Sequence, residues 1–534
     1  MQNHERREVA DYFYALGVTY STSTQGDRQL NFEQAITCFR RALDIYTPAA
    51  FPVEWARTQH DLGVAYRELQ LDDHQSHLKM AIACLLSSME VYTFDAFPIG
   101  WARTQYNLGL TYLALQGDDS HMPLEKAYTC FQAALEVYSS EVSPLEWANV
   151  QYSLGNLYCL LPDQHRIAML EKAIACYEVA LQVYTCETYP DAWAKTHNSL
   201  GNVYAFFPAQ DRTPYLHKAL FHYETSLQIN TFEAFPCNWA DTQLNLGNVY
   251  RKLPATDPDV NLHKAIACYK DALKVYTREA TPSDWATVQN NLGITYNLLS
   301  TGNEQARLEH AIACFQSALQ VFSYEHFPFE WAKTQNMLGL TYLDLPEGTP
   351  QHNLQQAIAC FESALHVYTR ENFSLGWAAL QSNLGNAYGN LTSEDPTENL
   401  LNATTHYETA LQIYTRKAFP FDWARMQNNL GNVYSTLMTL DQPANQIYVN
   451  KAIAFYRAAL LVYTCDQTPE EWATIQNNLG SAYANLLTGD RLEHLERAVS
   501  CYEAALQCFL SLHMEEHIQD VKSNLTRARS AMKL

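Results

Sequence analysis

The chain has 534 residues, of which 47% are hydrophobic and 17% are charged, and its formal net charge is −22. This acidity argues against general nucleic-acid binding, which relies on Lys and Arg to neutralise phosphates. No stretch approaches the roughly 18 apolar residues of a membrane span, and the opening MQNHERRE lacks the apolar core of a signal peptide. We therefore expect a cytoplasmic protein.

All ten tryptophans occupy one place in a repeating unit. Nine are 46 residues apart and the last follows after 49, namely Trp55, Trp101, Trp147, Trp193, Trp239, Trp285, Trp331, Trp377, Trp423 and Trp472. So rare a residue does not recur at fixed spacing by chance, so the sequence predicts a tandem array in which each unit packs on its neighbours. We expect one elongated array over residues 1–510, followed by a capping helix over residues 511–534.

The first half of each unit reads as a helix. The first unit has Val9 in place of Trp but keeps Gly17. In the unit that begins at Pro282, the spacing of Trp285, Gln289, Leu292 and Tyr296 is four, three and four residues, which marks one face of a helix. A glycine inside this helix costs about 1 kcal/mol against alanine. It recurs in all eleven units, which predicts that another backbone, that of the second helix, comes close to it.

The second half of each unit reads as a second helix after a polar loop. In the same unit it is predicted to begin near Leu308, with Ala311, Phe315, Ala318 and Leu319 as its buried stripe. Each unit is therefore helix–loop–helix, and about eleven units make an all-α solenoid. A three-residue insertion is expected in the loop of the tenth unit, around Thr439 to Gln446.

Eight of the thirteen cysteines share one register, Ala-x-x-Cys: Cys38, Cys84, Cys130, Cys176, Cys268, Cys314, Cys360 and Cys501. Equivalent sites in successive units should be about 10 Å apart, whereas a disulfide needs Cα atoms closer than about 7 Å. Disulfides and metal ligation are the alternatives, but we expect small buried residues in a reducing compartment.

The C-terminal segment reads as a cap. Ile518 and Leu525 fall where Trp and Leu would be, and Arg529 replaces the core Tyr, as expected for a capping helix with one polar face. His513 and His517 are four residues apart, so a helix would place them on one face. They lack the Glu that follows the first His in zinc proteases, so we do not expect a metal there.

The motif Leu-Gly-x-x-Tyr, followed by Ala-x-x-x-Phe/Tyr-x-x-Ala-Leu, resembles the tetratricopeptide repeat (TPR), whose period is about 34 residues. The variant Tyr-Thr-x-x-x-x-Pro-x-x-Trp-Ala resembles the long bacterial TPR arrays often joined to CHAT caspase-like proteases. The repeats extend to about Phe509, so we expect no such protease domain in this chain. The resemblance implies a right-handed superhelical solenoid whose first helices line a concave groove.

The resemblance places groove residues one past the glycine and two before it. Asparagine fills many of these places: Asn156, Asn202, Asn248, Asn386 and Asn432, then Asn107, Asn245, Asn291, Asn383, Asn429 and Asn478. Because asparagine is both donor and acceptor, such a ladder would suit a peptide backbone. The alternative, that these residues tie one helix to the next, stays open.

Two further sets of groove residues bear on partners. The Asn pairs resemble those of chaperone-binding TPR clamps, but the Lys such clamps need is replaced by Asn198, Leu244, Ser382 and Asn428, so we expect no carboxylate clamp there. Basic residues one turn further along would meet an acidic partner or simply be solvated: Arg57, Arg103, Lys195, Lys333 and Arg425.

Catalysis is not expected, because the sequence holds no Gly-rich phosphate loop and no cluster of acid, base or metal ligands in the groove. The Trp row is an aromatic platform or, as we expect, core packing. The sequence thus predicts a non-catalytic scaffold without cofactor or metal that binds an extended peptide or protein partner in the groove. The alternative is a regulatory or sensor subunit that controls a separately encoded effector such as a CHAT-type protease.

Overall fold

The computed structural model describes residues 2–70, 73–115, 121–161, 166–346, 350–391, 396–440 and 445–533. Over these ranges every regular element is an α-helix, which confirms the predicted all-α class. The chain divides into two compact units, Met1–Ala255 and Thr256–Leu534.

The N-terminal unit contains α1 (Gln2–Thr22), α2 (Arg28–Leu43), α3 (Pro52–Glu68), α4 (His74–Ser88), α5 (Pro98–Ala114), α6 (His121–Leu135), α7 (Pro144–Leu160), α8 (Arg166–Ala180), α9 (Pro190–Ala205), α10 (Thr213–Ser226) and α11 (Pro236–Lys252). The C-terminal unit contains α12 (Pro258–Ala272), α13 (Pro282–Leu298), α14 (Glu304–Ala318), α15 (Pro328–Asp344), α16 (Pro350–Leu365), α17 (Ser374–Asn390), α18 (Pro396–Ala410), α19 (Pro420–Leu440), α20 (Asn445–Ala459), α21 (Pro469–Asn485), α22 (Arg491–Ser511) and α23 (Glu515–Ala531).

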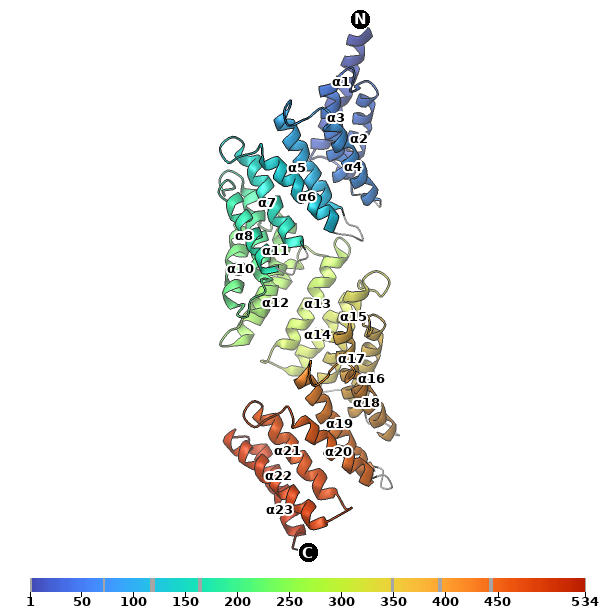
Figure 1. Cartoon of the computed structure of the whole chain (residues 1–534), viewed down its shortest axis with the longest axis vertical. Helices are drawn as coiled ribbons and strands as arrows, with labels where there is room; N and C mark the ends of the chain where they lie inside the picture. The colour runs from blue at the N-terminus through green and yellow to red at the C-terminus, as the bar shows by residue number, and fades with distance from the viewer. Residues whose placement is uncertain are drawn as a thin grey trace. The chain divides into compact units, whose positions relative to one another are not determined.

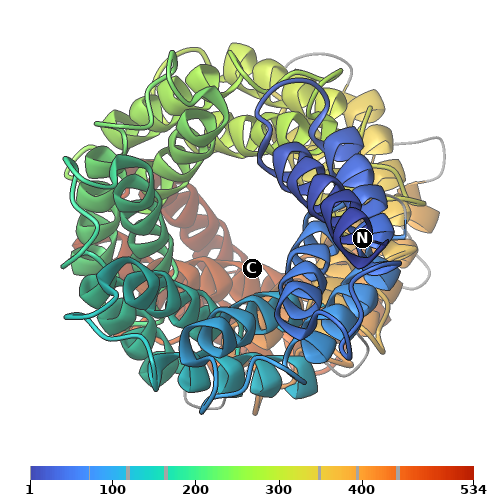
Figure 2. The same ribbon diagram turned by 90° about the horizontal axis from the view of Figure 1, so that it is seen from above.

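Within each unit the helices stack as successive pairs (Figure 1) along a curved path (Figure 2). Within a unit, an odd-numbered helix packs on the even-numbered helix that follows it, and odd helices also contact the next odd helix of the same unit. No two even helices contact one another in the described part of the chain. Elements on the inside of a curved stack are closer together than those outside, so the odd helices, which are the first helices of the repeats, form the concave layer. Each unit is therefore an all-α solenoid of stacked helix pairs, as the tetratricopeptide resemblance implies.

The recurrent glycine faces an aromatic ring. A Cβ atom added at Gly155 or Gly201 would lie 2.5 Å from Cε1 of Tyr177 or Tyr223. The expectation of a close backbone was therefore wrong at these positions. Of the repeat glycines whose surroundings the structure describes, Gly63 and Gly480 are those with a backbone oxygen among the three atoms nearest to an added Cβ. The missing side chain makes room for a ring of the second helix, which fills the space between the two helices.

In the repeat that begins at Pro282, the second helix begins earlier than predicted. Helix α14 begins at Glu304, four residues before the predicted Leu308, because Asn303 caps it and accepts a bond from the Ala306 N–H. Three of the four residues of the predicted stripe are buried. Leu319 is only half-buried because it lies just beyond the last helical residue, so that part of the prediction was wrong.

The tryptophans are all half-buried rather than fully buried. Trp101 and Trp331 pack against core clusters, as expected. Their outer sides are covered by a side chain from the preceding loop, with ring centroids 5.1 Å apart for Phe94 and Trp101 and 5.6 Å apart for Tyr324 and Trp331. In other units an arginine takes this place, as Arg370 does over Trp377. The Trp row therefore joins the core to the loops between units.

All thirteen cysteines are free thiols. Cys38, Cys130 and Cys360 are buried, and the other five cysteines of the shared register are half-buried, which corrects the expectation of uniform burial. Burial raises the pKa of Cys130 to about 11 and that of Cys360 to about 12. These thiols are therefore protonated and poor nucleophiles at neutral pH.

Helix α23 closes the stack with one buried face, formed by Ile518, Val521, Leu525 and Ala528. His513 lies in the turn before this helix with a φ of 57°. The expectation that one helix carries it together with His517 was therefore wrong.

The contact between glycine and ring predicts opposite effects for two glycines of α17. Gly385→Ala would place a Cβ 2.6 Å from Cε1 of Tyr407, so we expect overpacking to lower the free energy of unfolding by about 1–3 kcal/mol. At Gly389 the nearest atoms would be 3.8 Å away, so Gly389→Ala should raise stability by up to about 1 kcal/mol. Urea denaturation of both variants measures this, and equal effects would contradict the role given to the ring.

Candidate functional site

The concave layer carries an asparagine ladder, which we define as the asparagines one past and two before the repeat glycine. Asn156 and Asn202, one past the glycine, accept a hydrogen bond through Oδ1 from Tyr177 and Tyr223 of their own second helix, both at 2.7 Å. In the C-terminal unit Asn386 accepts in the same way from Tyr407 at 2.7 Å, and Asn432 from Tyr456 at 2.9 Å. Burial raises the pKa of these four tyrosines well above the usual value, so their hydroxyls stay protonated donors.

The next unit supplies a second bond to the same oxygen. Nδ2 of Asn245 donates to Oδ1 of Asn202 at 3.1 Å. Asn429 and Asn478 donate in the same way to Asn386 and Asn432, at 3.1 and 3.2 Å. Each such oxygen thus ties three helices together, so tying helices is one function of the ladder.

These bonds use only half of each amide. In the described part of the chain no acceptor is recorded for Nδ2 of Asn156, Asn202, Asn386 or Asn432, and no donor for Oδ1 of Asn245, Asn429 or Asn478. Each linked pair, such as Asn202 with Asn245, therefore presents one donor group and one acceptor in the concave layer.

Other predicted ladder residues are placed differently. Asn107 is held on both sides, because Oδ1 accepts from Arg67 at 2.8 Å and Nδ2 donates to the Arg103 carbonyl at 2.9 Å. Asn383 donates to Asn336 at 3.2 Å. Asn291 is buried, and Asn248 lines a small hollow beside Asn245. The ladder is therefore not uniform in its bonds, and it is interrupted in the sequence at the repeat of Gly339, where Met337 and Leu340 hold the two positions.

Three of the five predicted groove cations contact another side chain of the same compact unit of the chain. Arg57 stacks on the Tyr14 ring, 4.2 Å from its centroid. Lys195 and Arg425 form 2.8 Å ion pairs with Asp191 and Asp422 of their own helices. Arg103 and Lys333 are exposed, and they are the members of this set that would meet an acidic partner.

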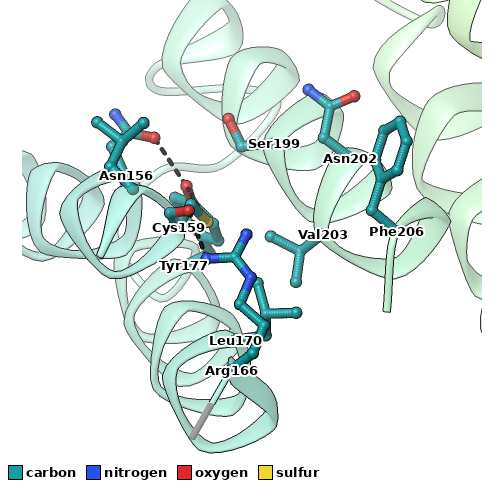
Figure 3. A pocket seen from close by; sticks show the side chains of 10 residues that line it. Asn156, Cys159, Arg166, Leu170, Tyr177, Ser199, Asn202, Val203 and Phe206 are labelled. Atoms are coloured by element: carbon teal, nitrogen blue, oxygen red, sulfur yellow. Dashed lines mark hydrogen bonds between the residues drawn. The ribbon is translucent and has the colours of Figure 1, made fainter. Parts of the chain in front are cut away.

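A hollow of about 360 Å³ opens between α7, α8 and α9 (Figure 3). Two ladder residues line it together with apolar and basic side chains: Asn156, Cys159, Leu160, Arg166, Leu170, Tyr177, Ser199, Asn202, Val203 and Phe206. Arg166 is fixed because its Nη1 donates to the Cys159 carbonyl at 2.7 Å. Phe206 keeps 62% of its surface exposed, so this hollow combines a polar rim with an apolar wall.

Sequence reasoning missed the partner of the ladder, although a signal for it exists. Wherever the residue one past the glycine is Asn or Ser, the aromatic residue of the second helix is Tyr, as in Asn156 with Tyr177 and Ser481 with Tyr502. Wherever that residue is apolar, the ring lacks a hydroxyl or is replaced by Leu, as in Leu110 with Phe131. The two positions vary together because the ring reaches the ladder residue. Arg166 and Phe206 have no such signal.

No family model and no curated protein matches the chain. Several solved structures are similar to it. The human IFIT1 dimer with PPP-AAAA is 15% identical with a TM-score of 0.40, covering 94% of each chain. The apo form of RapI is 13% identical with a TM-score of 0.40, covering 86% of this chain and 97% of that one. The TPR domain of P58(IPK) is 14% identical with a TM-score of 0.25, covering 89% and 98%. These matches describe stacked helices and carry nothing about partners.

Two further features of the described residues bear on other functions. Within the described ranges, no three side chains of His, Cys, Asp or Glu gather where they would hold a metal ion. Over the same ranges, no helix combines the length and the apolar character needed to cross a membrane.

A histidine pair joins α9 and α10. Nδ1 of His197 and Nδ1 of His222 are 2.9 Å apart. His197 meets the Trp193 ring edge-on and His222 stacks on Tyr204. Most other units have Gln and Cys at these two places, as Gln289 and Cys314. Burial lowers the pKa of both histidines to about 4, with the charge of Lys218 adding to the effect at His222.

The histidine pair should make the fold sensitive to acid. Unfolded histidines titrate near about pH 6.5, whereas the folded pair holds pKa values of about 4. The unfolded chain therefore takes up protons first, and the free energy of unfolding should fall as the pH drops through this window. The double variant His197→Gln with His222→Cys, which restores the common pair, should lose less stability in urea between about pH 7.5 and about pH 5. The exposed His326→Gln is the control, and an equal response in all three proteins would refute the assignment.

Proposed function

We propose that the chain is a non-catalytic scaffold that binds an extended peptide or protein segment along its concave layer. The observation that carries this proposal is the unused half of the ladder amides, a donor on Asn202 and an acceptor on Asn245 in one linked pair. An extended backbone presents one N–H and one C=O per residue. A linked pair is complementary to one such peptide group.

The hollow between α7, α8 and α9 supplies a place for a side chain of the bound segment. Leu160, Leu170, Val203 and Phe206 give it an apolar wall, and successive side chains of an extended strand point to opposite faces. A segment held by Asn156 and Asn202 on the rim would therefore place every second side chain toward the concave layer. We expect backbone contacts to give affinity and this hollow to select an apolar side chain.

The composition supports a protein partner rather than nucleic acid, since the net charge of the chain is −22. Arg103 and Lys333 are exposed cations of the concave layer, and they would suit acidic residues of the partner. We assign no cofactor and no catalytic residue to the chain.

The alternative is a regulatory or sensor subunit on which a separately encoded effector, such as a CHAT-type protease, docks. It is favoured by apolar side chains exposed at the second position of several first helices. Ile99 is 71% exposed, and Phe329, Leu375 and Phe421 are 44%, 50% and 51% exposed. An effector that docks on these side chains in either unit would bind independently of the ladder amides.

The proposal predicts that a change confined to Nδ2 weakens peptide binding. Asn156→Asp combined with Asn202→Asp keeps the oxygen that accepts from Tyr177 and Tyr223 but removes both free donors. Each lost bond is worth about 0.5–1.5 kcal/mol, so the affinity should fall by roughly fivefold to hundredfold. Fluorescence anisotropy measures this, with 16-residue peptides (a length of about 50 Å when extended) selected on the full chain from a displayed library.

The matched control is Asn303→Asp. Asn303 caps α14 through its oxygen, so the variant adds a negative charge and keeps the cap. Its affinity for the selected peptides should equal that of the parent protein. If the double variant also binds normally, while a variant at Phe329 and Phe421 loses a partner, the peptide proposal fails and the docking alternative replaces it.

A further inference from the structure

The last hollow of the C-terminal unit is lined without any carboxylate. It measures about 270 Å³ and lies between α21, α22 and the cap helix α23. Its lining consists of Ser481, Ala484, Asn485, Arg491, Leu495, Tyr502, Asn524, Arg527, Ala528 and Ala531. Two guanidinium groups thus share one hollow with amides and hydroxyls, on a chain whose net charge is −22.

The hollow continues the register of the ladder onto the cap. Thr526 stands in the place of the repeat glycine, so Arg527 holds the position that is Asn202 or Asn432 in earlier units, and Asn524 holds the position two before the glycine. Asn524 donates through Nδ2 to Oδ1 of Asn477 at 3.1 Å. Its own Oδ1 accepts from Nη2 of Arg527 at 2.6 Å. Asn524 thereby orients the guanidinium of Arg527 and uses one of its five N–H donors.

The second guanidinium is held by backbone carbonyls at the C-terminal end of α21. Nη1 of Arg491 donates to the carbonyls of Ala484 and Leu486, at 2.7 and 3.0 Å. In the described part of the chain no carboxylate pairs with either arginine of the hollow, whereas the neighbouring Arg529 pairs with Glu503 at 2.6 Å. Two positive groups are therefore fixed in place with their charges uncompensated.

The equivalent hollows at other points of the array differ in charge. The hollow between α1, α2 and α3 holds Arg28, but Asp61 and Glu68 also line it, and Arg28 lies 3.5 Å from Glu68. The hollow between α7, α8 and α9 holds a single guanidinium, that of Arg166, beside apolar side chains. The pairing of two arginines without an acid belongs, among these three hollows, to the C-terminal one.

We propose that this hollow is an oxyanion-binding site in which Arg491 and Arg527 hold a carboxylate or phosphate group. Guanidinium groups donate parallel N–H bonds that match the oxygens of both anions. Ser481 and Tyr502, whose oxygens are 3.0 Å apart, add hydroxyls to the wall. The site stands without the peptide proposal, although an acidic residue of a segment bound along the ladder would reach the same register.

Equilibrium dialysis of radiolabelled inorganic phosphate against the full chain tests the site. We expect one phosphate per chain, with an affinity that falls about tenfold or more in Arg527→Gln, because a bond to a charged group is worth about 1.5–3 kcal/mol. Arg527→Lys should restore binding in part, since it returns the charge but not the fork. Arg527 is exposed, so circular dichroism should show an unchanged helical content in both variants.

The control is Arg529→Gln, which removes an equal charge from the same helix outside the hollow and should leave phosphate binding unchanged. Absence of bound phosphate, or equal loss in the Arg527 and Arg529 variants, would overturn the site.

Competition identifies the source of the anion. Displacement by a blocked tri-glutamate peptide, but not by its tri-glutamine counterpart, indicates a peptide carboxylate. Retention against both indicates free phosphate, and displacement by tri-glutamine would overturn the proposal.

Discussion

The contact between the repeat glycine and a ring of the second helix is the constraint from which the concave surface follows. Without a Cβ at Gly201, the Tyr223 ring sits against the first helix, and its hydroxyl then arrives beside the next residue, Asn202. A buried hydroxyl without a partner would cost about 1–3 kcal/mol, so a tyrosine there requires a polar neighbour. Phenylalanine has no such need, and Leu110 beside Gly109 faces Phe131. The buried ring of the second helix thus partly determines whether the neighbouring groove residue is polar or apolar.

This origin does not make the asparagines unavailable to a ligand, because a tie and a binding site use different atoms. The bonds from Tyr223 and Asn245 fix the oxygen of Asn202 and therefore also fix the direction of its Nδ2. A donor whose rotamer is already locked loses less entropy when a ligand binds. The contacts that tie the helices together would therefore also favour the ligand binding that we propose for the ladder.

The period of Trp and Gly was enough to predict the helix pairs and most of their buried stripe, because each repeat follows one local pattern. It predicted the residues of the ladder but not their bonds, since the ring that reaches Asn156 is 21 residues away in sequence. The co-variation of Tyr with Asn could have supplied this link. The roles of Phe206 and Arg527 could not be predicted from the repeat, because each residue lines one particular hollow. A repeat pattern gives no information about residues that depart from it.

Variation inside the array comes in pairs at several places where two side chains meet across the two layers, although His406 is matched by the common Gln381. Tyr appears with Asn, Phe with an apolar residue, and His197 with His222 where most units hold Gln and Cys. A single change at such a place leaves a buried group unmatched, which restricts how these positions vary. Residues at the open ends of the hollows, such as Phe206 and Arg527, lack this restriction because one side of each meets solvent. We therefore expect the repeats to differ from one another first at the open ends of the hollows, because a side chain there can change without a compensating change in a partner.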